Sequence, residues 1–272
     1  MTTPRLKRHN FGRGGHAYTL DCDCPGRYRK TDPHKIFGVT TALGVLNKAG
    51  LVGWAGRITA EYALDHWEEL ALMQPSERLD TLRSVQFNTK KAAALRGNQV
   101  HAYAERLAAG HDVPVDDIDR GPVEALARWL DREEYVSIAG EVPCVNTQYR
   151  YGGTLDSVGV LGRRGETALI DFKRTNAVYD EVAYQLTGYR YCDLWQPDGP
   201  KSEQPMPQVD AVYVVHIKAD SVEMHPVEVD DSSFAEFTYI LQVARDQEAI
   251  RDNSRIGPVM EPLPPLEEDT DD

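Results

Sequence analysis

The residues that could do chemistry gather around one short apolar segment, residues 168–175, with the sequence ALIDFKRT. Asp171 and Lys173 stand two positions apart at its end, and side chains at i and i+2 of a β-strand share one face. Asp156 ends the segment GGTLD in the preceding predicted strand. If the two strands form a hairpin, Asp156 comes beside Asp171, and adjacent carboxylates repel unless they are protonated or share a cation. Oxygen ligands suit Mg²⁺ or Mn²⁺, so the pattern indicates a divalent-cation site beside a lysine.

Two predicted helices carry further polar pairs at a spacing of four, which places each pair on one helical face. His101 and Glu105 occur in GNQVHAYAE, and Gln185 and Tyr189 occur in QLTGY. Taken singly, each pattern is more commonly structural: a histidine on an amphipathic helix is usually a satisfied, partly buried side chain. Coincidence becomes improbable when all four patterns occur in one chain in this order, and the combination favours a single active site. The patterns are G-x-x-x-H-x-x-x-E, G-G-x-x-D, D-x-K and Q-x-x-x-Y.

The elements that must position these residues follow from the hydrophobic periodicity. Residues 1–35 are expected to be irregular, with a strand at HAYTLD, and the chain is then helical as far as residue 135. The second half predicts an αβββαββα order with a mixed sheet between helices. Its strands are expected at 135–148, 151–161, 166–174, 209–219 and 222–229, and its helices at 121–135, 178–195 and 232–251. Helices at 39–46, 53–73, 76–91 and 96–110 are expected before it.

Composition sets the class of protein. A chain of 272 residues with 41% hydrophobic residues can bury a substantial core. There is no apolar run of the length a membrane span needs and no apolar signal segment, so we expect a cytoplasmic protein and no membrane partner. Cys22, Cys24, Cys144 and Cys192 are too scattered to predict a disulfide framework.

The net charge of −13 at first argues against nucleic acid as a partner, but the charge is unevenly distributed. Residues 1–50 carry nine Lys or Arg against three Asp, whereas residues 251–272 carry two Arg against seven acidic residues. The positive charge of residues 1–50 is compatible with local binding of a polyanion.

These motifs together resemble the PD-(D/E)XK nuclease superfamily, in its RecB-like branch. The pattern is most similar to exonucleases associated with CRISPR adaptation and to phage-type single-domain members. The resemblance covers about residues 95–230 and implies a restriction-endonuclease-like αβββαβ core with a mixed central sheet flanked by helices. It implies three parts: a basic, mostly helical N-terminal extension at 1–94, a nuclease core at 95–253, and a Pro-rich acidic disordered tail at 254–272.

The resemblance also implies roles for individual residues. His101, Asp156, Asp171 and the backbone carbonyl of Phe172 would hold Mg²⁺ or Mn²⁺. Lys173 would position and help to deprotonate the attacking water, with its pKa lowered if the amine is partly desolvated and close to the metal. The residues expected to act beside them are Gln185 and Tyr189 at the scissile region or the lysine, Glu105 as a second-shell or second-metal group, and Arg150, Arg174 and Arg190 at DNA phosphates.

The expected activity is a metal-dependent DNA exonuclease that leaves 5′-phosphates, in phage DNA replication, recombination or repair in the host cytoplasm. Related enzymes commonly hold an iron–sulfur cluster with one upstream cysteine and three near the C-terminus. No cysteine follows Cys192, so no such cluster is expected. The expected partners are DNA and a single-strand annealing protein or helicase. Strand polarity and oligomeric state are left open.

Three alternatives stay open from the sequence. The chain could be a catalytically silent nucleic-acid-binding or adaptor protein on a nuclease fold, or a metal-dependent endonuclease. It could also act on proteins through the acidic tail LEEDTDD, although such tails usually only aid solubility. The sequence has no P-loop, no H-E-x-x-H and no G-x-S-x-G motif, which disfavours an NTPase, a zinc protease and a serine hydrolase.

Overall fold

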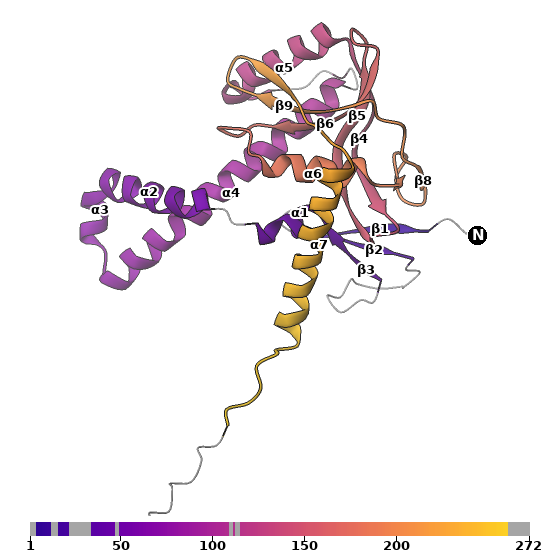
Figure 1. The fold of residues 1–272 in the computed structure, drawn as a ribbon. Helices are drawn as coiled ribbons and strands as arrows, with labels where there is room; N and C mark the ends of the chain where they lie inside the picture. Colours follow the sequence, from indigo (N-terminus) through magenta and orange to yellow (C-terminus); the bar gives the residue numbers. More distant parts are fainter. Residues whose placement is uncertain are drawn as a thin grey trace, which may run out of the picture.

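The computed structural model describes residues 4–11, 16–21, 34–46, 49–108, 111 and 115–260. It has a mixed α/β fold, in which a curled mixed sheet lies between helices (Figure 1). The helices are α1 (Val39–Ala42), α2 (Ala49–Asp65), α3 (Trp67–Leu72), α4 (Pro75–Ala108), α5 (Arg120–Glu133), α6 (Glu181–Arg190) and α7 (Asp231–Asp252), with short 3₁₀ turns η2 (Leu43–Val45) and η3 (Asp117–Asp119). The strands are β1 (Leu6–Asn10), β2 (His16–Leu20), β3 (Lys35–Gly38), β4 (Tyr135–Asn146), β5 (Tyr151–Leu161), β6 (Glu166–Lys173), β7 (Leu194–Trp195), β8 (Gln204–Pro205), β9 (Ala211–Ile217) and β10 (Val222–Pro226).

The sheet is built around β5. β4 pairs antiparallel along one edge of β5, and β7 continues that side. On the other edge, β3 runs parallel to the start of β5 at Tyr151 and Gly152, whereas β6 runs antiparallel to its end, from Ser157 to Leu161. Because β3 and β6 pair with different ends of the same edge, the sheet forks there, and residues 153–156 of β5 lie at the fork.

Two hydrophobic cores hold the helices to the sheet. One core joins α1, η2, α6 and α7 to one face, with Phe237 and Leu186 among its fully buried side chains. The other joins α4 and α5 to the opposite face around Trp129 and Phe172. Alternation along β6 therefore sends Phe172 towards α5, and sends Asp171 and Lys173 towards α6.

Local sequence explains where several elements begin and end. α5 is strongly amphipathic, with Pro122 in its first turn, and it stops at Glu134, which adopts a left-handed conformation with φ 52° before β4 begins. α7 starts with a reciprocal capping box between Asp230 and Ser233. Gly152 is required by close packing, because a Cβ there would lie 2.6 Å from the Cys144 carbonyl oxygen.

The predicted order of the second half is confirmed for its main elements, with β4, β5 and β6 close to their predicted limits, whereas the short strands β7 and β8 were not predicted. α6 is shorter than the expected 178–195. The Asn146 side chain donates to the Tyr191 carbonyl oxygen at 2.6 Å, and Leu194 and Trp195 then leave the helix to pair with β4. α4 is one helix where two were expected, so the expected domain limit between residues 94 and 95 falls inside it.

The N-terminal part contains more β-structure than predicted. β1, β2 and β3 form an antiparallel set that joins the central sheet through β3. α2, α3 and the first part of α4 project from the body of the molecule (Figure 1). Residues 254–260 are exposed and lie outside any helix or strand, and the acidic residues of the tail lie beyond the described residues. In the described ranges, no helix combines the length and the apolar character needed to cross a membrane.

Candidate active site

The two predicted carboxylates meet at the fork of the sheet. β5 and β6 form the predicted hairpin, and the register that pairs Ser157 with Ile170 brings Asp156 opposite Asp171 one residue further on. The Phe172 backbone N–H donates to Asp156 Oδ2 at 2.9 Å, so a side chain takes the place of a strand partner at this point. The fork therefore leaves Asp156 beside the end of β6, half-buried and fixed by the main chain.

Asp171 is the most enclosed charged group of the site, with 1% of its surface exposed. Lys173 Nζ lies 2.8 Å from its Oδ1 and 2.7 Å from its Oδ2, and Gln185 Nε2 donates to Oδ1 at 3.1 Å. Asp171 and Lys173 are two positions apart on β6, and α6 faces that strand. Three predicted residues, Asp171, Lys173 and Gln185, therefore lie together.

The charge balance of this group explains the state of Lys173. Burial by itself lowers the pKa of the Lys173 amine, but the carboxylates of Asp171 and Asp156, together with the hydrogen bond to Asp171, raise it above its ordinary value of 10.5. The amine is therefore a charged ammonium at neutral pH. Two carboxylates against one ammonium leave the group with a net negative charge, which favours binding of a cation.

Tyr189 lies one helical turn after Gln185 and is 3% exposed. Burial is the largest of the causes that raise the pKa of its phenol well above 10, and Cys144 and Asp156 raise it further. The phenol therefore stays neutral. Its ring lies against β5 at Gly153, where an added Cβ would be 2.5 Å from Tyr189 Cε1. Both glycines of the GGTLD motif therefore serve close packing: Gly152 against β4 and Gly153 against the tyrosine.

A cavity of about 470 Å³ opens in front of this group. Asp156, Gln185 and Tyr189 line it, together with side chains from the first two strands. Arg8 and His16 contribute basic groups to its lining, and Glu141 contributes a carboxylate. Tyr18 Oη lies 2.7 Å from Thr154 Oγ1.

Sequence reasoning missed this contribution of β1 and β2. The basic character of the first fifty residues and the predicted strand at HAYTLD were the signals that pointed towards it.

The residues predicted on α4 can be placed only in part. Ala102 lines the same cavity, so the helical turn that carries His101 passes beside it. The side chains of His101 and Glu105 lie outside the described structure.

The three arginines predicted at DNA phosphates have different surroundings. Arg174 forms an ion pair with Asp119, a carboxylate that is 1% exposed. Arg190 Nη2 donates to the Val209 carbonyl oxygen at 3.0 Å. Arg150 has a positive φ of 50° in the turn between β4 and β5.

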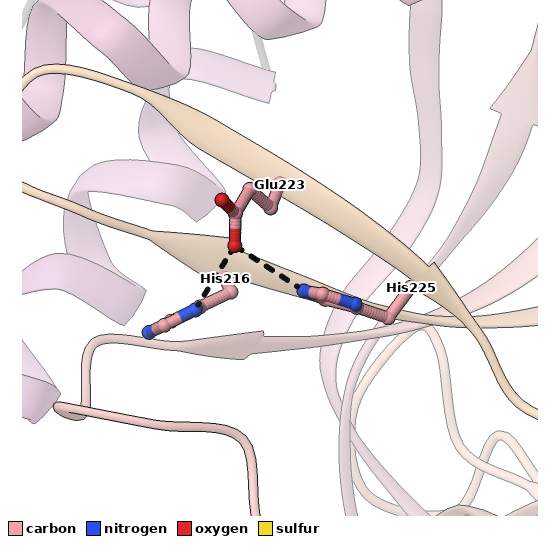
Figure 2. A group of neighbouring side chains, drawn as sticks. All are labelled: His216, Glu223 and His225. Carbon is pink, nitrogen blue, oxygen red and sulfur yellow. Dashed lines mark ion pairs between the residues drawn. The ribbon is translucent and has the colours of Figure 1, made fainter.

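A second group of polar side chains lies on the neighbouring hairpin of β9 and β10, where sequence analysis predicted no site. Lys173 of β6 pairs in register with His216 of β9, and β10 brings Glu223 and His225 towards His216 (Figure 2). The signal in the sequence was the spacing H-x₆-E-x-H across a predicted hairpin. A separate cavity of about 730 Å³ adjoins these three residues.

The fold and the site define a mixed α/β protein with a carboxylate–lysine site at a fork in its sheet. The chain matches no protein-family model and no curated protein. It is similar to the solved structure of LHK-Exo in complex with dAMP, with 16% identity and a TM-score of 0.33 over 57% of this chain and 85% of that one. A second LHK-Exo structure, described as an alkaline exonuclease from Laribacter hongkongensis, gives 16% identity and a TM-score of 0.34 over 55% and 79% of the two chains. The structure of SSO0001 gives 14% identity and a TM-score of 0.34 over 81% and 78%. Similarities at this level do not assign the chain to a family.

Proposed function

We propose that this protein is a divalent-metal-dependent deoxyribonuclease that acts as an exonuclease and leaves 5′-phosphates. We further propose that it is a RecB-like PD-(D/E)XK nuclease that serves phage DNA replication, recombination or repair. The observation that carries the proposal is the meeting of Asp156, Asp171 and Lys173 at the fork of the sheet, where Gln185 also donates a hydrogen bond to Asp171 Oδ1.

The donor set fits a hard divalent cation. Asp156 and Asp171 offer carboxylate oxygens on adjacent strands, and their combined charge exceeds that of the single ammonium beside them. In the proposal, His101 and the carbonyl of Phe172 complete the ligands. The Phe172 N–H bond to Asp156 supports this arrangement, since it fixes that carboxylate beside the Phe172 main chain.

Each residue of the proposed site then has a defined role. Gln185 holds Asp171 in one orientation, and Lys173 donates hydrogen bonds to the attacking water. With its raised pKa, Lys173 can accept a proton only after a cation has offset the charge of its two carboxylate neighbours. Bound Mg²⁺ or Mn²⁺ would supply the Lewis acidity that polarises the phosphodiester and stabilises the leaving 3′ oxygen. Arg8 and His16 on the cavity wall could contact phosphates on the substrate strand.

The decisive experiment incubates the protein with end-labelled linear DNA and with closed circular DNA in the presence of Mn²⁺. We expect only the linear DNA to be degraded, and the products to carry 5′-phosphates. Asp171→Asn and Lys173→Ala should abolish degradation, whereas Asp131→Ala, which changes an exposed acidic residue of α5, should leave it unchanged.

Other outcomes would refute parts of the proposal separately. Cleavage of closed circular DNA would identify an endonuclease. DNA binding without hydrolysis in Mn²⁺ or Mg²⁺ would identify a silent binding protein. Unchanged hydrolysis by Asp171→Asn, when its circular dichroism matches that of the parent protein, would overturn the site itself.

A further inference from the structure

The register of the β9–β10 hairpin brings three side chains together, those of His216, Glu223 and His225. Glu223 is directly opposite His216, and opposed residues of an antiparallel pair project to the same face. His225 follows Glu223 by two positions and therefore shares that face. Glu223 Oε2 lies between the two imidazoles, 3.8 Å from His216 Nδ1 and 3.6 Å from His225 Nε2 (Figure 2).

A hydrogen bond at Nε2 of His216 determines whether Nδ1, which faces Glu223, can act as a ligand. His216 is 5% exposed, and its Nε2 lies 2.7 Å from the carbonyl oxygen of Thr175. A carbonyl oxygen can only accept, so Nε2 must carry the proton and donate it. In the neutral ring, Nδ1 then presents a lone pair towards the carboxylate oxygen of Glu223. Histidine ligands of metals are typically oriented by this kind of bond from the other ring nitrogen.

Two lone pairs that face each other need a positive charge between them. A bridging proton would require Nδ1 and Oε2 to approach to about 2.8 Å, which is roughly 1 Å closer than the observed 3.8 Å. Ligand bonds of about 2.1 Å in a tetrahedral site separate two donor atoms by about 3.4 Å. The separations of 3.6 and 3.8 Å from Glu223 Oε2 need to change by only a few tenths of an ångström to reach that value. The ligand atoms of His216 and His225 lie within 4.8 Å of each other and must approach by at most about 1.4 Å. The geometry is therefore closer to that of a metal site than to that of a proton bridge.

The surroundings leave room for an ion. Lys218 Nζ pairs with Oε1 of Glu223, which leaves Oε2 directed at the imidazoles. All three candidate ligands line the cavity of about 730 Å³, so an ion held there would keep an open position for water or a small anion. The ammonium of Lys218 would repel the ion and would weaken its binding.

We propose that His216, Glu223 and His225 form a site for a borderline transition-metal ion of the Zn²⁺ class. Two imidazole nitrogens and one carboxylate oxygen suit Zn²⁺ better than Mg²⁺, which prefers a ligand set made mostly of oxygen atoms. The site is separate from the carboxylate pair of the proposed nuclease centre, although it adjoins that centre through the register of Lys173 with His216. It would join the β9–β10 hairpin to the segment that follows Lys173, because Thr175 orients the His216 ligand.

The test uses Zn²⁺ alone as the probe, with the full chain free of any polyhistidine tag, in competition with a chromophoric chelator. The parent protein should bind one Zn²⁺ per chain at this site, and His225→Ala and Glu223→Gln should each weaken binding by more than about tenfold. Both positions are exposed, so these variants should fold. Glu228→Gln, which changes another exposed carboxylate of the same cavity, is the matched control and should bind as the parent does.

Two further variants separate this site from the proposed nuclease centre and test its electrostatics. A chain with both Asp156→Asn and Asp171→Asn should retain the Zn²⁺ ion. Lys218→Gln should bind it about tenfold more tightly at low salt, because a like charge has been removed. Co²⁺ in the parent protein should give the intense visible absorption of a four- or five-coordinate site, and Glu223→Gln should lose it. Equal Zn²⁺ binding by the parent, His225→Ala and Glu223→Gln would overturn the proposal, as would loss of the ion only in the Asp156/Asp171 variant.

Discussion

Substitution of Gly153 by alanine tests how the fork of the sheet is packed. The added Cβ would lie 2.5 Å from Tyr189 Cε1, 3.2 Å from its Oη and 3.3 Å from its Cζ, whereas ordinary contacts begin at 3.4 Å. The ring or the strand must therefore move by roughly 1 Å. Tyr189 is 3% exposed and packs within the larger core, so a shift of its ring disturbs buried contacts. Overpacking of this kind costs about 1–3 kcal/mol of unfolding free energy.

The measurement is urea denaturation followed by circular dichroism. With a denaturant slope of about 2–3 kcal/mol/M, Gly153→Ala should lower the midpoint by roughly 0.3–1.5 M. Gly56→Ala in α2 is the matched control, because a Cβ at that glycine meets no atom within 4 Å. That change removes a glycine from a helix interior and should stabilise the protein by up to about 1 kcal/mol.

A double-mutant cycle decides whether the Tyr189 ring is the cause. Leucine at position 189 lacks the three ring atoms nearest to Gly153, so Gly153→Ala should cost much less in a Tyr189→Leu chain than in the parent. An equal loss of stability in both backgrounds would refute the packing argument. A loss of the proposed nuclease activity larger than the loss of folded protein would show that displacement of the ring also disturbs the candidate site, at Tyr189 itself or at Asp156, three residues along β5.

Three further outcomes follow from the described contacts. Asp119→Asn should destabilise the protein by about 3 kcal/mol in urea titrations, because it leaves Arg174 without its buried partner, and Arg174→Met in the same chain should recover part of that loss. Burial lowers the pKa of Lys173 but its carboxylate neighbours raise it above 10.5, so the stability that this ion pair contributes is fully present below pH 10.5 and is lost as the pH rises through the folded-state pKa. The difference in melting temperature between the parent and Lys173→Met should accordingly stay constant from pH 7 to 10 and shrink above 10.5. Tyr135→Phe should cost about 1 kcal/mol, because it removes the buried 2.7 Å bond to Ser157, and no change in thermal unfolding would contradict this.

The local sequence pattern was sufficient to predict the main strands and helices in the second half of the chain. Alternating apolar residues identified β4, β5 and β6, and the short turns between them required antiparallel neighbours. The spacing of Asp171 and Lys173 then placed both side chains on one face, and their ion pair is present. Such features depend on residues that are close in the sequence, and the period of the side chains reports them directly.

Contacts between distant segments could not be predicted in the same way. β3 joins the sheet by parallel pairing with β5, more than 100 residues later, and nothing in its four residues specifies that partner. The fork depends on this pairing, and so does the presence of Arg8 and His16 on the cavity wall. Arg174 also looked free in the sequence, yet it pairs with Asp119, which precedes it by 55 residues.

The sequence by itself determined the order of strands and helices in the core and the chemical types that meet at its centre, because hydrophobic period and short turns fix local geometry. Tertiary structure alone decided that the first strands form one wall of the cavity. It also decided that Gly153 must accommodate Tyr189, and that His216 lies beside Lys173 with Glu223 and His225 in reach. These features depend on which strands become neighbours, and that choice is made by the burial of the whole sheet between two helical layers.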